Sequence, residues 1–355
     1  MAADPNVSGP RPDDAPGGPD ADPTAASDVP ADAPAGPYGA GAASAETTGA
    51  GADGPALHAL ERAARVPGEA TLADRVKTFS VAPLPHHALS RAVLWATRRR
   101  SSLVTPVVRR FARAYDVDMS DAVEPELGAY ETFNAFFTRA LRPDARPVPA
   151  DPEAIASPAD GRISGIGRVR DARVLQAKGV DYSLLELLGG DGEATERLAD
   201  GGFATVYLSP RDYHRLHMPR TGTLLRQTHV PGRLWSVGPH AVRALDGLFA
   251  RNERVIAQFD TERGRMALVL VGAINVAAIE TVWAGLVTPP QRRTVTRVDY
   301  TGDERVTIER GAEMGRFNMG STVIALFEHG CDWSDALEAE SPVRVGESLG
   351  RVRPG

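Results

Sequence analysis

The sequence has 355 residues, enough for one large domain or two small ones, and a formal net charge of −6. Its single cysteine, Cys331, excludes a disulfide within the chain, and no apolar run reaches the roughly 20 residues that a membrane-spanning helix needs. The first 55 residues hold nine acidic residues and one basic residue, so the remainder carries about +2, and we expect no nucleic-acid partner.

Residues 1–55 consist almost wholly of Ala, Pro, Gly, Asp, Ser and Thr. A stretch with so little apolar surface cannot offset the entropy of the unfolded chain, so we predict a disordered acidic tail. The stretch has neither the basic start nor the apolar run of a secretory signal.

Residues 56–150 are predicted to be mainly helical and basic, with breaks at prolines and a short helix at 132–140. Nine basic residues and one acidic residue lie between Asp74 and Arg113. A basic amphipathic helix with an aromatic residue such as Trp95 can lie on an anionic membrane surface. A helical pair packed on the rest of the protein, with solvated arginines, explains the pattern equally well.

In residues 151–355 the sequence pattern changes to short Val/Ile/Leu-rich runs, which are separated by turns rich in Gly, Pro and Asp. This pattern predicts an α+β protein with a mainly antiparallel β core, sandwich-like or barrel-like, and with helices at 183–188 and 240–248. We find no internal repeat. Strands are expected at 203–208, 255–259, 266–271, 295–298 and 323–327.

Four places could carry chemistry. One of them, the pair of segments 231–237 and 248–254, places polar residues next to apolar ones and could line a pocket, although loop and core are the simpler interpretation. Asp160 stands in the turn Ser-Pro-Ala-Asp-Gly at 157–161, where an ordinary turn residue is the simpler interpretation. His214 and His217 are three apart and could be metal ligands, a general acid or base, or structural histidines. Ser321 lacks the Gly-x-Ser-x-Gly spacing of an α/β-hydrolase. The chain order Asp160, His217, Ser321 is compatible with a Ser/His/Asp triad, but order alone is not diagnostic.

Further blocks accompany these residues in chain order. They are Phe136-Phe137-Thr138-Arg139, Leu141-Arg142-Pro143 with Arg146-Pro147, Gln176-Ala177-Lys178-Gly179, Tyr207 to Arg215 with His217, Asn252-Glu253-Arg254, Ile279 to Gly285, Glu313 to Phe317, and Gly320-Ser321-Thr322. Each block is a weak signal alone. The ordered set, from about residue 75 to the C-terminus, resembles the phosphatidylserine decarboxylases of bacteria.

The resemblance implies that the chain cuts itself between Gly320 and Ser321. Ser321 Oγ would attack the Gly320 carbonyl carbon, with His217 as the base and Asp160 orienting the imidazole. β-Elimination and loss of ammonia would then leave a pyruvoyl group in place of Ser321. The products would be a large chain, 1–320, and a small chain, 321–355, that form a heterodimer.

The resemblance further implies a carboxy-lyase that converts phosphatidylserine to phosphatidylethanolamine and CO₂, through a Schiff base between the pyruvoyl group and the substrate amine. The pyruvoyl group would take the place of pyridoxal phosphate, which needs a lysine, and Lys77 and Lys178 are the only lysines. No metal is implied. His214 matches a histidine placed near the substrate and is our candidate for the proton donor after decarboxylation.

Because the substrate stays in the bilayer, the resemblance favours the membrane interpretation of residues 56–150. We expect a peripheral protein docked on the anionic, cytoplasmic side of the cell membrane, and a homo-oligomer is compatible with this picture. Three positions depart from the family pattern: Met319 replaces leucine or phenylalanine, Gly238 replaces asparagine, and Ala277-Ala278 replaces a Gly-Ser pair. The replacements at Gly238 and at Ala277-Ala278 would change the polarity of the pocket and therefore the preference for the lipid headgroup.

Two other functions stay open at this point. A Ser/His/Asp hydrolase acting on a lipid would remain one intact chain. A non-catalytic homologue that binds the membrane surface would neither cut itself nor release CO₂. A metal site at His214 and His217 would instead carry bound zinc.

Overall fold

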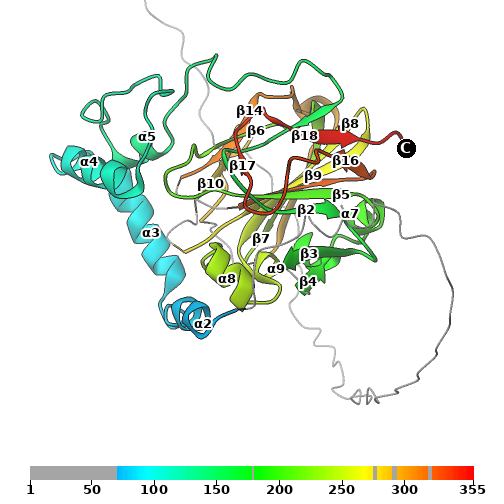
Figure 1. Ribbon diagram of the computed structural model, residues 1–355, viewed down its shortest axis with the longest axis horizontal. Helices are drawn as coiled ribbons and strands as arrows, with labels where there is room; N and C mark the ends of the chain where they lie inside the picture. The colour runs from blue at the N-terminus through cyan, green and yellow to red at the C-terminus, as the bar shows by residue number, and fades with distance from the viewer. Residues whose placement is uncertain (1–69, 178–179, 275–277, 290–293, 319–321) are drawn as a thin grey trace, which may run out of the picture. The chain divides into compact units, whose positions relative to one another are not determined.

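The computed structural model describes residues 70–177, 180–274, 278–289, 294–318 and 322–355, and the predicted disordered tail lies outside these ranges. Its largest sheet has nine strands, which pair antiparallel in the order β12–β7–β8–β9–β15–β5–β2–β17, with β13 on β7 outside this path (Figure 1). The bounds are Gly161–Arg168 (β2), Gly202–Tyr207 (β5), Gly222–Val230 (β7), Arg254–Thr261 (β8), Gly264–Val271 (β9), Thr296–Asp299 (β12), Thr307–Ile308 (β13), Thr322–Phe327 (β15) and Pro342–Val343 (β17).

The large sheet is buried on both faces in its central strands. In β15, Val323 and Ala325 pack in one hydrophobic core, while Ile324 and Leu326 pack in another. Successive side chains of a strand point to opposite faces, so a strand covered on both sides is apolar at every position. This is why the strands appear in the sequence as unbroken apolar runs and not as an alternating pattern.

The first face is covered by two smaller antiparallel sheets, β11–β10–β14–β6 and β1–β18–β16. The second face is covered by short helices and by the hairpin β3–β4. In Figure 1 the small sheets and the short helices lie on opposite sides of β2 and β5. The bounds are Ala154–Ala156 (β1), Arg173–Ala177 (β3), Val180–Ser183 (β4), Arg215–His217 (β6), Ile279–Thr281 (β10), Gly285–Leu286 (β11), Glu313–Phe317 (β14), Cys331–Trp333 (β16), Ser348–Val352 (β18), Leu184–Leu187 (α6), Gly192–Leu198 (α7), Pro239–Ala244 (α8), Leu248–Arg251 (α9) and Gly302–Glu304 (a 3₁₀ turn, η1).

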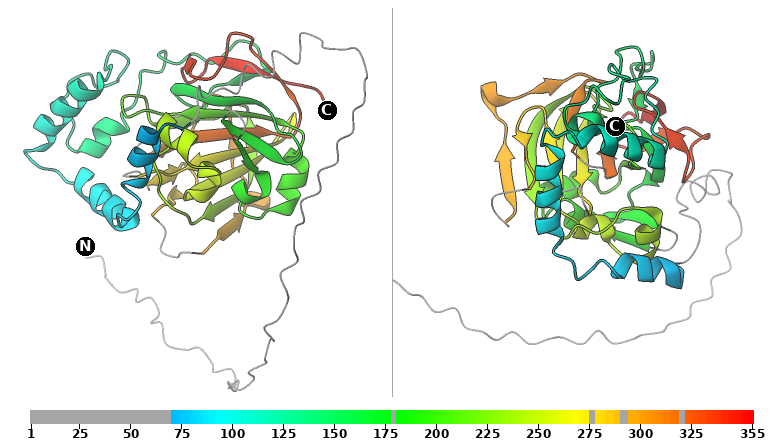
Figure 2. Two further views of the ribbon diagram at one scale, coloured as in Figure 1. Left: turned by 60° about the horizontal axis from the view of Figure 1, so that its bottom comes forward. Right: turned by 90° about the vertical axis from the view of Figure 1, so that its left-hand side faces the viewer.

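In the described part of the chain, four helices precede the sheets: α2 (Leu72–Phe79), α3 (His86–Thr97), α4 (Val104–Tyr115) and α5 (Phe133–Phe137). The helix α2 starts at a capping box, in which Thr71 and Asp74 bond each other's backbone amides. It lies beside α8 (Figure 2, blue and yellow-green). Asp74 Oδ1 and Arg243 Nη2 form an ion pair between the two helices, with the atoms 2.9 Å apart. The helices α4 and α5 share a separate core of aromatic and aliphatic side chains.

The structure confirms the predicted fold class, an α+β protein with mostly antiparallel sheets and an N-terminal helical region. The prediction of one helix at 240–248 is wrong. α8 ends at Ala244 because Leu245 is extended, and Gly247, at φ +65°, reverses the chain before α9. In the described part of the chain, no helix is both long enough and apolar enough to span a bilayer.

Candidate active site

The predicted cleavage site falls in residues 319–321, which lie outside the described residues, but both of its flanks are described. On one side, the Phe317 amide donates to the carbonyl of His214 at 2.9 Å. On the other side, Thr322 opens β15 and pairs with Tyr207 and Val271. The chain therefore enters the cleavage site from the small sheet that carries the histidine segment and leaves it in the middle of the large sheet.

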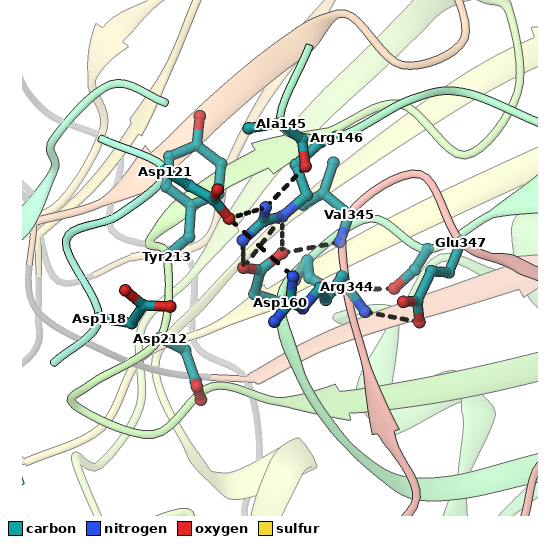
Figure 3. Close-up of polar contacts among 12 residues, drawn as sticks. Asp118, Asp121, Ala145, Arg146, Asp160, Asp212, Tyr213, Arg344, Val345 and Glu347 are labelled. Atoms are coloured by element: carbon teal, nitrogen blue, oxygen red, sulfur yellow. Dashed lines mark hydrogen bonds and ion pairs between the residues drawn. The ribbon is translucent and has the colours of Figure 1, made fainter. Parts of the chain in front are cut away.

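Asp160 is fixed by contacts that the sequence did not predict (Figure 3). Its carboxylate accepts from Arg146 Nε at 2.9 Å and Nη2 at 2.5 Å, and from the backbone amide of Val345 at 2.7 Å. Gly161 follows directly, and a Cβ at this position would lie 2.2 Å from the Tyr207 carbonyl oxygen. The turn therefore needs glycine after the aspartate in order to sit this close to β5.

Arg146 bridges two carboxylates. Its Nη1 bonds Asp121 at 2.8 Å, and the side chains of Arg146 and Asp160 are only 13% and 11% exposed. Burial alone would lower the pKa of Arg146, but the hydrogen bonds to Asp160 and Asp121 hold it above its ordinary value. The guanidinium is thus a permanent positive charge beside Asp160.

His217, on β6, is arranged as a neutral base. Its Nδ1 donates to the Gly311 carbonyl at 2.7 Å, so Nε2 carries the lone pair and accepts from the Tyr213 hydroxyl at 3.1 Å. Burial lowers the pKa of His217, although the Gly311 carbonyl and the charges of Glu313 and Asp160 oppose this shift. In this arrangement Gly311, and not Asp160, sets the tautomer, and the predicted contact between Asp160 and His217 stays a prediction.

His214 is fully buried and packs against Phe137, with ring centroids 4.0 Å apart and the two rings tilted by 42°. Its Nδ1 donates to the Asp212 carbonyl at 2.8 Å, and burial lowers the pKa of His214 to about 3. Among the described residues its Nε2 has no partner. A neutral imidazole of this tautomer can accept a proton at Nε2 but must receive one before it can donate, so the donor role stays a prediction.

His214 and His217 have different partners: His214 contacts Phe137 and the Asp212 carbonyl, whereas His217 contacts Tyr213 and the Gly311 carbonyl. Within the described ranges, no group of three or more His, Cys, Asp or Glu side chains could hold a metal ion.

Arg146, Tyr213 and Gly311 were not among the predicted site residues. Arg146 and Tyr213 stood inside blocks of the family pattern, which was the one available signal, whereas Gly311 acts through its backbone carbonyl. Asp160 and Tyr213 also line a polar cavity of about 270 Å³, walled chiefly by aspartate and arginine side chains. Charged groups of both signs thus lie beside the turn at 157–161.

Comparison with known proteins identifies the family of the chain. The family model of phosphatidylserine decarboxylase matches residues 133–351, and a second model, PSD, matches residues 76–116. The phosphatidylserine decarboxylase proenzyme of Alkalilimnicola ehrlichii is 57% identical over 262 residues, which cover 72% of this chain and 90% of the relative.

Two further relatives carry the same name. The proenzyme of Pseudomonas aeruginosa (strain LESB58) is 53% identical over 279 residues, or 78% of this chain and 96% of the relative. That of Bordetella avium is 50% identical over 281 residues, or 79% and 95%. A model match over more than half of the chain, together with identities this high, shows the relationship. The chain therefore belongs to the phosphatidylserine decarboxylase family and is a decarboxylase, that is, a lyase.

Proposed function

We propose that this chain is a proenzyme that cuts itself between Gly320 and Ser321 and then, as two chains, converts phosphatidylserine to phosphatidylethanolamine and CO₂. The observation that carries the proposal is the state of His217, a partly buried imidazole whose Nε2 lone pair can accept a proton. The relatives, which are named proenzymes, support the self-cleavage.

In the first step, His217 Nε2 takes the hydroxyl proton of Ser321 while Ser321 Oγ forms a bond to the Gly320 carbonyl carbon. The protonated His217 then returns its proton to the Ser321 nitrogen as the Gly320–Ser321 amide bond breaks, and an ester between Gly320 and Ser321 Oγ replaces the amide. Tyr213, whose hydroxyl lies on Nε2, has to give way to Ser321 for this transfer. Burial raises the pKa of Tyr213 to about 12, so it remains a neutral hydrogen-bond donor and leaves no charge behind.

The pyruvoyl group that follows would supply an electron sink for the loss of CO₂. The described residues fit a polar group at this position. Thr322, which would follow it directly, is fully buried, and the His214 Nε2 is a buried acceptor without a partner among the described residues. Uncompensated buried polar atoms are rare and costly, so their presence beside the cleavage site supports a bound group there. His214 would accept a hydrogen bond, or a proton, at Nε2.

The small chain, 321–355, would stay with the large chain after the cut. β15 lies between β9 and β5 in the large sheet, β17 pairs with β2, and β16 and β18 continue the small sheet begun by β1. Cleavage at residue 320 breaks one covalent bond and none of these strand ladders. The heterodimer is held by the same hydrogen bonds and core contacts as the uncut chain.

The helical region is proposed to dock the enzyme on the anionic, cytoplasmic side of the cell membrane. Trp95 on α3 is 62% exposed, and Leu103 and Val107 around the start of α4 are 67% and 50% exposed. Between them lie Arg98, Arg99 and Arg100. Exposed apolar side chains beside a cluster of cations are the features of an interfacial helix, and the substrate is a membrane lipid.

The test is release of ¹⁴CO₂ from vesicles that contain phosphatidylserine labelled in the serine carboxyl group. The wild type should release it and the Ser321→Ala variant should not. Release of fatty acid or free serine in place of CO₂ would support a lipid hydrolase. Binding of vesicles with no product of any kind would support a binding homologue.

A further inference from the structure

A second buried imidazole and carboxylate pair lies outside the residues used above. His229 on β7 donates from Nε2 to Glu253 Oε1 at 3.1 Å, and the two residues are 4% and 1% exposed. The remaining atoms of the pair, His229 Nδ1 and Glu253 Oε2, have no partner among the described residues. A buried carboxylate oxygen left in this state is costly unless something binds it.

The backbone holds Glu253 rigidly in place. Its amide donates to the Arg233 carbonyl, and its own carbonyl accepts from the Gly272 amide, both at 2.8 Å. A Cβ on Gly232 would lie 2.6 Å from the Glu253 nitrogen, so only glycine permits this approach of the 231–235 segment. Such a frame preorganises the carboxylate for a ligand.

Glu253 also lines the inner wall of a cavity of about 690 Å³. The wall includes His87 from α3, Trp235, and the guanidinium groups of Arg233 and Arg251. Arg233 and Arg251 are exposed residues, and neither makes an ion pair with any residue that the structure describes. The cavity thus has cations toward solvent and a buried carboxylate at its inner end.

The cavity lies close to both the cleavage site and the helices. Arg254, the residue after Glu253, pairs with Val271, and Val271 pairs on its other side with Thr322, so Arg254 and Thr322 are about 10 Å apart. On the outer side, His87 Nε2 donates to the Gly232 carbonyl at 3.0 Å and joins α3 to the cavity wall. A lipid headgroup entering past α3 would meet the arginines first and Glu253 afterwards.

We propose that this cavity binds the phosphoserine headgroup, with Arg233 and Arg251 receiving the phosphate and Glu253 receiving the primary ammonium. In the headgroup the phosphate is next to the glycerol, and the α-carbon beyond it carries both the ammonium and a carboxylate, so the phosphate can meet the exposed arginines while the ammonium reaches Glu253. The inference rests on the proposed function, from which it takes the substrate. It makes Glu253 a specificity residue and His229 the residue that positions it.

The experiment uses the full-length Ser321→Ala chain, because the cavity is present in the uncut chain and no keto group can then react with an amine. Calorimetry measures the Kd of soluble glycerophosphoserine, of glycerol 3-phosphate, which lacks the ammonium, and of inorganic phosphate. The Ser321→Ala chain, the parent of the other variants, should bind glycerophosphoserine with a Kd about 10-fold lower than that of glycerol 3-phosphate. Glu253→Gln should abolish this preference and leave the Kd of glycerol 3-phosphate unchanged, and the exposed control Glu196→Gln should change neither.

The double variant Arg233→Gln/Arg251→Gln should weaken both glycerol ligands by roughly 10-fold or more. Since both side chains are exposed, this variant keeps the test valid if thermal unfolding shows that Glu253→Gln does not fold. A parent without preference for the amine, or a folded Glu253→Gln that keeps it, would overturn the assignment. Binding of inorganic phosphate as tight as that of glycerophosphoserine would also overturn it. None of these results depends on self-cleavage or CO₂ release, so the two proposals fail separately.

Discussion

His217 and its neighbours show how a histidine is prepared as a base by residues distant in sequence. The Gly311 carbonyl accepts a hydrogen bond from Nδ1, and the Tyr213 hydroxyl donates one to Nε2. Burial lowers the pKa of the imidazole. The neutral, proton-accepting form is therefore the resting state at neutral pH. Asp160, by contrast, is held by Arg146 and Val345 and shapes the site through its fixed charge.

Replacing His217 by glutamine should slow self-cleavage by at least about 100-fold, because the serine loses its base. The precursor is made by cell-free translation, and its conversion to two bands is followed with time. His329→Gln, a partly buried histidine on a loop elsewhere, serves as the matched control and should process normally. Processing of His217→Gln at the wild-type rate would assign the base to another group.

The pH dependence of self-cleavage follows from the direction of the shift. Because burial disfavours the imidazolium, His217 stays neutral at pH values where an exposed histidine would already be protonated. We expect the cleavage rate constant to hold steady as the pH falls through the ordinary histidine pKa and to decline only below it. A decline centred at or above that ordinary pKa would show that His217 is not the titrating base.

Arg146→Gln should destabilise the uncut chain by about 3 kcal/mol, because it leaves the buried Asp160 carboxylate without its partner. The free energy of unfolding is measured by urea titration in the Ser321→Ala background. Arg168→Gln, which removes an exposed pair with Asp200, is the control and should change little. Equal free energies of unfolding for Arg146→Gln and Arg168→Gln would mean that Arg146 does not stabilise the turn at 157–161.

At the scale of elements, α3 and the start of α4 present both cations and apolar side chains to solvent. Replacing Arg98, Arg99 and Arg100 by glutamine should weaken binding to vesicles with anionic lipid by about 100-fold, at roughly 1 kcal/mol per charge. Sedimentation with the vesicles measures the bound fraction. The control replaces three other exposed arginines, Arg168, Arg170 and Arg305, and should bind as before. Equal losses in both triple variants would indicate a net-charge effect and not a docking surface.

The position of β15 between β9 and β5 leads to a prediction about the processed protein. The two chains should elute together in gel filtration under native conditions and separate only in denaturant. A central strand cannot leave without breaking two ladders and both cores. Recovery of free small chain under native conditions would contradict this arrangement.

Comparing the elements with the sequence shows which signals carry local information. The apolar runs predicted β5, β8, β9 and β15 because burial on both faces leaves a strong pattern, whereas β12, predicted at 295–298, is a strand whose residues are all exposed. The break between α8 and α9 was missed because it depends on one residue in extended conformation, Leu245, and on Gly247. The contacts of Asp160 with Arg146 and Val345 join segments 14 and 185 positions away, and no local pattern contains them.

At the scale of the whole molecule, the chain is folded so that the proposed cut would leave two chains joined by the strand ladders of β15 and β17. The most direct test is the intact mass of the purified, denatured protein beside that of Ser321→Ala. The account predicts two wild-type chains, 1–320 and 321–355, with the small chain lighter than a serine start by one ammonia, and a single uncut chain for the variant. A folded wild-type protein that remains one chain of 355 residues would contradict the self-cleavage on which the account rests.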